Sequence, residues 1–123
     1  MSTRIFLLFL ALAEIGACPL HAEASGTVGG TVVLVSGTAP SLRTVGYGAG
    51  MTLILDCNGS ELKRIADENG DFQISLPAGK WHLVRVLDGR RREVAIERTQ
   101  SRDFDVRDDQ HTRFDVMVRR PPN

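Results

Sequence analysis

Cysteine is scarce in this chain. Only Cys18 and Cys57 occur among the 123 residues. Small exported domains that depend on disulfides carry a larger, even set of cysteines, so the sequence excludes a disulfide framework. If the segment that contains Cys18 is removed after export, Cys57 remains as a lone thiol. We expect it to be a small buried residue at the end of a strand.

The chain also lacks an excess of charge of either sign. It has 15 basic and 15 acidic residues, which give a formal net charge of +0. A balanced charge gives no electrostatic reason to expect nucleic acid as a partner. The local basic run Arg90-Arg91-Arg92 is interpreted as a solvated turn between strands.

Long hydrophobic runs are absent. The apolar run Ile5–Ala13 is shorter than the roughly 20 residues that span a bilayer. Arg4 precedes it and the small-residue pattern Ala22-Glu23-Ala24 follows, which is the layout of a secretory signal peptide. The sequence therefore predicts a cleaved signal peptide over residues 1–24, a domain over 25–119 and a tail over 120–123. The mature protein is expected in the periplasm or outside the cell, without a transmembrane span.

An alternative form of export involves Cys18. The stretch Ile15-Gly16-Ala17-Cys18 fits the loose pattern of a bacterial lipoprotein cleavage site, where the new N-terminal cysteine carries lipid. Lipidation at Cys18 would tether the protein to a membrane. Glu14 places a carboxylate beside this site, and we favour ordinary cleavage after Ala22 or Ala24.

Hydrophobic residues in the remainder of the chain alternate with a period of two, which is typical of strands. No segment shows a helical stripe of useful length. Turn signals recur every 8–12 residues, as in sandwiches and barrels. The segment from Gly37 to Gly50 is predicted to be a loop, because it contains Pro40 and several glycines. Seven strands are predicted, at Thr27–Val35, Met51–Cys57, Leu62–Ala66, Phe72–Leu76, Lys80–Leu87, Val94 to Val106, and Thr112–Val118.

One stretch resembles a known family. Ala66-Asp67-Glu68-Asn69-Gly70-Asp71-Phe72-Gln73-Ile74, followed by Leu76-Pro77-Ala78-Gly79-Lys80-Trp81-His82-Leu83, is similar to the carboxypeptidase regulatory-like domain family. Its pattern is T-D-x-x-G-x-F-x-F and then L-P-x-G-x-Y-x-L. Ala66, Ile74 and Trp81 replace the usual threonine, phenylalanine and tyrosine. The structural motif positions are Asp67, Gly70, Phe72, Leu76, Pro77, Gly79 and Trp81.

This resemblance implies a transthyretin-like fold. The expected fold class is therefore all-β, a seven-stranded antiparallel Greek-key β-sandwich. The motif residues have structural reasons: a glycine at the hairpin corner can take positive φ, and the aromatic residues fill the core. In this family the domain accompanies peptidases or outer-membrane receptors, or stands alone in exported proteins. A fold match of this kind carries no activity.

Residues that could support chemistry are few. His82 and His111 do not lie in a nucleophile motif, so no catalytic residue is predicted. Asp67, Asn69 and Asp71 begin like a calcium loop, but the glycine is misplaced and a simple turn explains them better. A copper site would have to draw on the residues His82, His111, Met51, Met117 and Cys57, whose spacing supports no particular grouping.

The sequence thus predicts a protein that is not an enzyme and has no cofactor. The leading hypothesis is a non-catalytic exported module that binds an unidentified envelope protein or has a structural role in the bacterial cell envelope. An exposed sheet edge or the Ser36–Gly50 loop would make the contact. The alternative hypothesis is a periplasmic protein that binds a small ligand or a metal.

Overall fold

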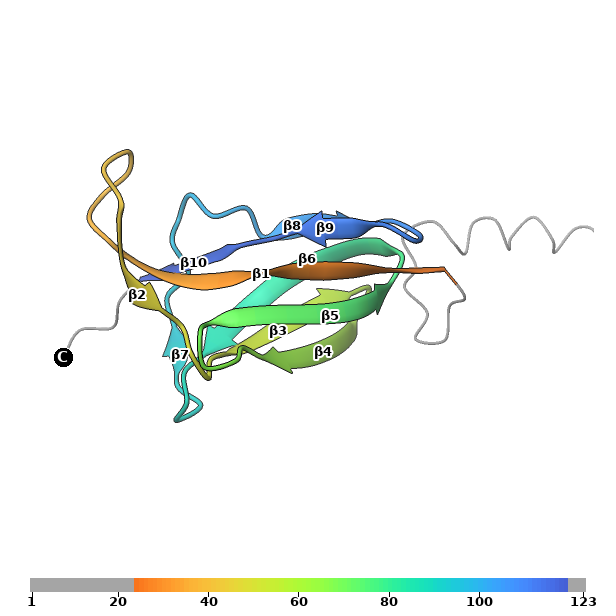
Figure 1. Cartoon of the computed structure of the whole chain (residues 1–123), viewed down its shortest axis with the longest axis horizontal. Coiled ribbons are helices and arrows are strands. Elements are labelled where there is room, and N and C mark those ends of the chain that lie inside the picture. Colours follow the sequence, from red (N-terminus) through yellow and green to blue (C-terminus); the bar gives the residue numbers. More distant parts are fainter. Residues whose placement is uncertain (1–23, 120–123) are drawn as a thin grey trace, which may run out of the picture.

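The computed structural model describes residues 24–119, and within them it contains strands and no helix. The predicted signal peptide, the lipidation candidate Cys18 and the tail lie outside the described residues. The domain is all-β, as the alternation predicts. Its ten strands (Figure 1) are β1 (Ser25–Ser36), β2 (Arg43–Tyr47), β3 (Thr52–Cys57), β4 (Ser60–Ile65), β5 (Asp71–Pro77), β6 (Gly79–Leu87), β7 (Glu93–Val94), β8 (Asp103–Val106), β9 (His111–Arg113) and β10 (Val116–Arg119).

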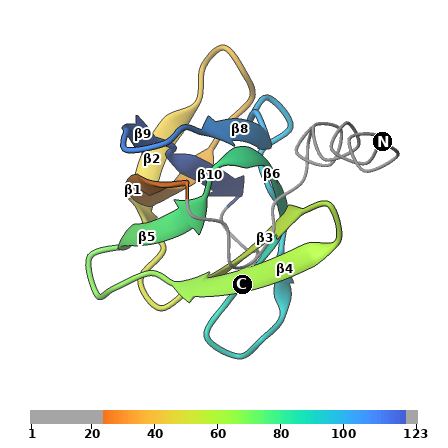
Figure 2. The same ribbon diagram turned by 90° about the vertical axis from the view of Figure 1, so that its right-hand side faces the viewer.

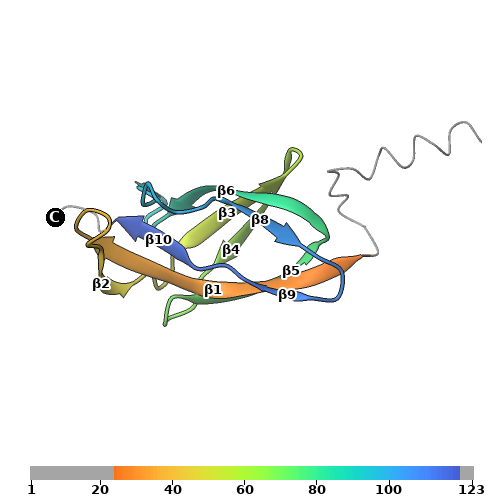
Figure 3. The same ribbon diagram turned by 90° about the horizontal axis from the view of Figure 1, so that it is seen from above.

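The strands form two five-stranded sheets that face each other (Figure 3). The first sheet is built around β1, which pairs with β2, β5, β9 and β10. The second sheet has the order β4-β3-β6-β7, and β8 also pairs with β6. Seen from the end, the two layers enclose the interior between them (Figure 2), a sandwich-like arrangement that buries one face of each sheet.

Strand β1 organises the first sheet because it is long enough to have two neighbours on each side. Along one side it runs antiparallel to β5 over Ser25–Thr31 and then to β2 from Val33. Along the other side it runs parallel to β9 and β10. The expectation of a purely antiparallel fold is therefore wrong. The chain reverses at residues 107–110 as it leaves the second sheet, so β9 and β10 enter the first sheet in the direction of β1.

The number of strands also differs from the seven expected. Strand β2 lies within the segment predicted to be a loop. Gly46 and Gly48 interrupt the sequence around Thr44, Val45 and Tyr47, so no alternation of polar and apolar side chains is visible there. Two predicted strands are each divided in two. The last one is interrupted at Asp115, whose Oδ1 accepts a hydrogen bond from the backbone N–H of Thr31 at 2.9 Å and so takes the place of a strand carbonyl.

The core lies between the two sheets and consists of aromatic and branched aliphatic side chains. Trp81 is its largest fully buried side chain, and Phe104 and Phe114 stack with ring centroids 4.4 Å apart. The core also includes Val28, Val32, Leu53, Leu55, Phe72, Leu76, Leu83, Val86, Val94, Val106, Val116 and Val118. Apolar burial of this kind is the main stabilising contribution in a domain of this size.

An irregularity in β6 changes which side chains face the core. The predicted alternation placed Trp81, Leu83 and Arg85 on one face of the strand. The pairing with β3 shifts between Leu83 and Arg85, so Val84 is an extra residue and the faces exchange after it. As a result Val86 is buried and Arg85 is exposed.

Candidate functional site

The turn between β4 and β5 contains the first part of the family-like motif. Oδ1 of Asp67 accepts hydrogen bonds from the backbone N–H groups of Asn69 (2.8 Å) and Asp71 (2.9 Å). Gly70 has a φ of +82°, as predicted, but the expected hairpin is wrong: β4 and β5 belong to different sheets, so the turn connects the two sheets. The carboxylate of Asp71 is engaged elsewhere, because it accepts a hydrogen bond from the Thr31 hydroxyl at 2.6 Å. These oxygen atoms hold a turn rather than surround a cation.

The second part of the motif lies at the β5–β6 connection. Leu76 and Trp81 are buried in the core, as predicted, and Phe72 is buried with them. The indole N–H of Trp81 donates to the backbone carbonyl of Pro77 at 2.9 Å. This bond ties the large ring to the turn that precedes it and satisfies the only polar group of the indole.

The turn between β6 and β7 uses the same device, which the sequence analysis missed. Oδ1 of Asp88 accepts from the backbone N–H groups of Arg90 (2.8 Å) and Arg92 (2.9 Å). The backbone hydrogen bond from Arg92 is the largest cause of the lowered pKa of Asp88. The matching spacing of Asp67 and Asp88 relative to their donors is a signal that sequence reasoning could have found.

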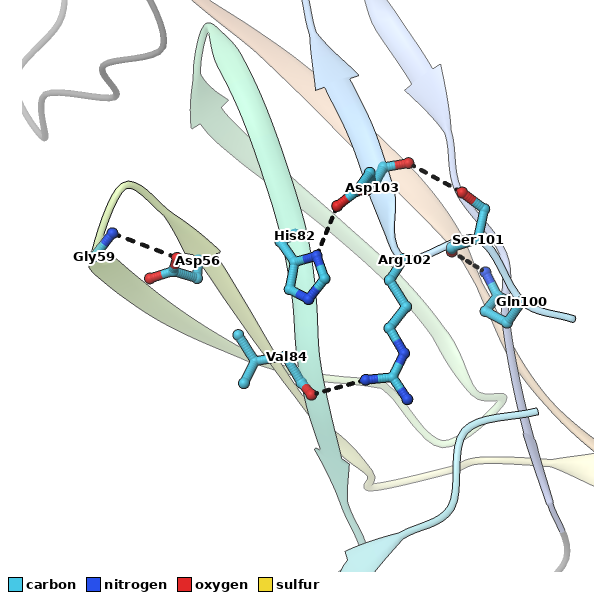
Figure 4. A network of polar contacts seen from close by, with 8 residues as sticks. All are labelled: Asp56, Gly59, His82, Val84, Gln100, Ser101, Arg102 and Asp103. Carbon is cyan, nitrogen blue, oxygen red and sulfur yellow. Dashed lines mark hydrogen bonds and ion pairs between the residues drawn. The ribbon is translucent and has the colours of Figure 1, made fainter. Parts of the chain in front are cut away.

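The most chemically suggestive pair is His82 with Asp103. His82 lies on β6 and Asp103 on the neighbouring β8, where the two residues are direct cross-strand partners. Nδ1 of His82 lies 2.6 Å from Oδ1 of Asp103, and both side chains are exposed (49% and 83%) (Figure 4). They line a shallow hollow of about 400 Å³ together with Lys80, Trp81, Phe104 and Asp105.

The surroundings of this pair do not complete a catalytic arrangement. In Figure 4 the neighbouring Arg102 reaches the carbonyl of Val84 (3.5 Å), and the Ser101 hydroxyl donates to the carbonyl of Asp103 (3.4 Å) rather than to the imidazole. An activated serine needs its hydroxyl on the histidine. Over residues 24–119 no group of three or more His, Cys, Asp or Glu side chains could hold a metal ion.

The other residues considered for a copper site lie in different parts of the fold. His111 lies on β9 in the first sheet, where its Nδ1 is 2.8 Å from the Thr27 hydroxyl. Met51 is buried in the core and Met117 is half-buried on β10. The fold therefore brings none of these side chains to His82.

Cys57 corrects an expectation. It was predicted to be a lone thiol, but in the structure it is disulfide-bonded. It is also buried in the core at the end of β3, as predicted. Cys18, the other cysteine of the chain, lies outside the described residues.

An ion pair with a buried carboxylate, also missed from the sequence, joins the end of β10 to two loops. Glu97 is only 6% exposed, and its Oε1 accepts a hydrogen bond from Arg119 at 2.8 Å. The same Arg119 nitrogen donates to the carbonyl of Gly37 at 2.6 Å. Burial raises the pKa of the Glu97 carboxyl, but the hydrogen bonds from Arg119 and Thr99 outweigh this effect and hold the pKa below its ordinary value.

Several strands have a strand neighbour on one side only within the described part of the chain, among them β2, β4 and β5. Strands β2 and β5 pair only with β1, and β4 pairs only with β3. An edge of this kind presents unpaired backbone N–H and C=O groups to an approaching chain. The edge of β5 lies beside two hollows, and Arg64 of β4 lines both of them. The open edge between β4 and β5 is therefore available for a contact through the backbone.

No protein-family model and no curated protein matches this chain. Two solved structures are similar to it. A DUF3823 family protein from Parabacteroides merdae has 20% sequence identity and a TM-score of 0.46, with 77% of this chain and 46% of that chain covered. A leucine-rich repeat protein from Bacteroides thetaiotaomicron has 15% identity and a TM-score of 0.50, with 78% of this chain and 12% of that chain covered.

These similarities concern the fold alone. The chain spans less than half of either structure, and the identities are too low to carry an activity from one protein to another.

Proposed function

We propose that this protein is a non-catalytic exported module that binds another protein of the bacterial cell envelope, and that its domain is a transthyretin-like Greek-key β-sandwich of the carboxypeptidase regulatory-like type. Export is supported by the signal-like N-terminal sequence. The family assignment is supported by the motif residues from Asp67 to Trp81, whose structural roles agree with those expected from the resemblance.

The observation that carries the binding proposal is the unpaired edge of the fold at β4 and β5. Several carboxylates of the described residues hold turns and loops, as Asp67, Asp88 and Glu97 do. The His82–Asp103 pair has no nucleophile on its imidazole. Contact through backbone and surface then remains as the use that the geometry supports best.

The test is cross-linking of the protein in intact cells of its own host, followed by affinity purification and mass spectrometry. One envelope protein should be captured reproducibly, and a signal-peptide deletion that keeps the protein in the cytoplasm should abolish its capture. Recovery of no specific partner would refute the proposal.

The intact mass of the exported protein tests the mode of export. A species that begins after Ala22 or Ala24 supports a soluble protein and directs the search to soluble partners. A heavier species that begins at Cys18 and carries acyl chains would instead make the protein a lipid-anchored component of the envelope.

A further inference from the structure

We propose that the free edge of β5 binds an extended segment of a partner protein by strand addition, and that Arg64 receives a carboxylate side chain of that segment. This inference rests on the proposed function and specifies the site and the chemistry of the partner. It depends on three features of the structure: the direction of the free backbone groups on β5, the lack of edge protection on that strand, and the unpaired charge beside it.

The pairing of β5 with β1 determines which of its backbone groups are free. Val32 donates to the carbonyl of Gly70 at 2.8 Å, and Ala78 donates to the carbonyl of Ala24 at 3.0 Å. The register between these two bonds is regular. In an antiparallel pair alternate residues direct both backbone groups at the neighbour. Phe72, Ile74 and Leu76 therefore face β1, while Asp71, Gln73 and Ser75 face away from it.

The turn removes Asp71 from this set. Its N–H donates to the Asp67 carboxylate at 2.9 Å, and its carbonyl accepts from the Asp67 N–H at 2.8 Å. Two residues remain, Gln73 and Ser75, each with an outward N–H and an outward C=O that have no partner in the described chain. These four backbone groups could form the hydrogen bonds of one added strand. Ile74, which lies between Gln73 and Ser75, is half-buried.

The free edges of the described strands differ in their protection. Strands β7, β8 and β9 are two to four residues long and each carries a charged residue, and β10 is hydrogen-bonded on its other side to residues 95–97. Strand β4 carries Glu61, Lys63 and Arg64, and charges on an edge discourage pairing with another chain. Strand β2 is irregular, because its register with β1 shifts between Leu34 and Val35. Between Phe72 and Leu76, β5 has no charged residue, no proline and no bulge. It is the edge least defended against an added strand.

Arg64 gives this edge its preference for a carboxylate. In β4 it is the cross-strand partner of the core residue Leu53, so it lies on the inner face at the open side of the domain. It lines a hollow of about 450 Å³ with Gln73, Ile74 and Ser75, and its side chain makes no ion pair or hydrogen bond within residues 24–119. Guanidinium groups bind carboxylates through two parallel hydrogen bonds.

A second copy of this chain fits the edge less well. Two β5 edges could satisfy all four free groups by pairing Gln73 with Ser75 of the other copy, with a twofold axis at Ile74. Arg64 lines the hollow at this same position, so the symmetry would bring two guanidinium groups together. Like charges at close range oppose association. An acidic segment of a different protein avoids this repulsion.

The test is selection of peptides from a random display library on the exported protein purified from its own host. We expect enriched peptides to contain an Asp or Glu in an otherwise uncharged, strand-forming sequence. A synthetic copy of the best peptide should bind Arg64→Glu about fivefold or more weakly. Lys63→Glu, a matched charge change at the next residue of β4 and on its other face, should bind as the wild type does.

Backbone variants test the strand addition itself. Ser75→Pro removes an outward N–H without touching the β1 ladder and should abolish peptide binding, whereas Ser75→Ala should retain it. Amide hydrogen exchange of Gln73 and Ser75 should slow when the peptide binds, a readout that needs no variant. No enriched peptide, enrichment that ignores Arg64, or unchanged exchange at both amides would overturn the inference.

Three further outcomes bear on this inference and on the proposed function. A wild-type dimer in sedimentation that Ser75→Pro converts to a monomer would assign the edge to a second copy and overturn the inference. If the Ser75→Pro and Arg64→Glu variants still capture the envelope partner in cells, the binding module stands and the β5 site is wrong. If the wild type captures no partner, the proposed function itself fails.

Discussion

Individual carboxylates in this domain act as parts of the backbone framework. Asp67 and Asp88 each accept two backbone N–H groups within a turn, and Glu97 binds both Arg119 and the hydroxyl and N–H of Thr99. The hydrogen bonds favour the ionised form of Asp88 and Glu97, and the pKa of each of these two carboxyls is lowered. Part of the stability of the fold is therefore linked to pH.

The linkage should be visible at Glu97. Its pKa in the folded state lies below the ordinary value of 4.5, so its ionised form stabilises the fold above that pH, and this contribution is lost as the pH falls through the folded-state pKa. In urea denaturation, Glu97→Gln should be clearly destabilising at about pH 7, and the difference from the wild type should shrink toward about pH 3. Glu93→Gln, an exposed control four residues earlier, should show no such trend; a constant difference at Glu97 would contradict the assignment.

The buried indole of Trp81 gives a second prediction for a single side chain. Trp81→Phe leaves unfilled volume in the core and takes the donor from the carbonyl of Pro77. We expect a loss of about 2 kcal/mol in the free energy of unfolding, measured by urea denaturation. An unchanged transition midpoint would mean that the ring is not packed in this way in solution.

Residue burial could be predicted from the sequence more readily than residue pairing. Phe72, Leu76 and Trp81 alternate with polar neighbours, and the structure confirms their burial. The pairing of His82 with Asp103 could not be predicted, because the two residues are 21 positions apart and meet only through the register of β6 and β8.

At the scale of strands and turns, the local sequence predicts the positions of most strands but not which strands pair with each other. The extra residue at Val84 reverses the faces of β6, and nothing in the alternation of that strand indicates it. The parallel pairing of β1 with β10 depends on where the chain crosses between sheets, a property of the assembled fold. Strand β2 could not be recognised in its glycine-rich segment, because that segment has a low intrinsic strand propensity and becomes a strand by pairing with β1.

The turn at Gly70 supports a prediction at this scale. Gly70 and Gly59 both have positive φ (+82° and +89°), so alanine is strained at either position. A Cβ at Gly70 would also lie 3.0 Å from Cβ of Tyr47 and 3.1 Å from the N atom of Gly48, whereas at Gly59 it would meet nothing within 4 Å. We expect Gly59→Ala to cost about 1 kcal/mol and Gly70→Ala clearly more, in thermal or urea unfolding. Equal costs would show that β2 does not lie against this turn.

At the scale of the whole molecule, the two sheets separate the residues that could have formed a metal site. His82 lies on the second sheet and His111 on the first, while Met51 is enclosed in the core between them. The remaining alternative function, a periplasmic protein that binds a metal, needs several ligands to converge on one point. A two-layer fold with its ligands in different layers opposes that convergence.

This separation leads to an expected result with added metals. Copper(II), zinc and calcium at modest excess over the protein should leave the thermal unfolding midpoint within about 1 °C of the metal-free value, because binding to the folded state alone raises that midpoint. The comparison should include His82→Ala and His111→Ala, and the metal-free midpoint of each variant is its own reference. A rise of several degrees that disappears in both variants would mean that the two histidines share a metal, and the alternative function would then replace the binding module.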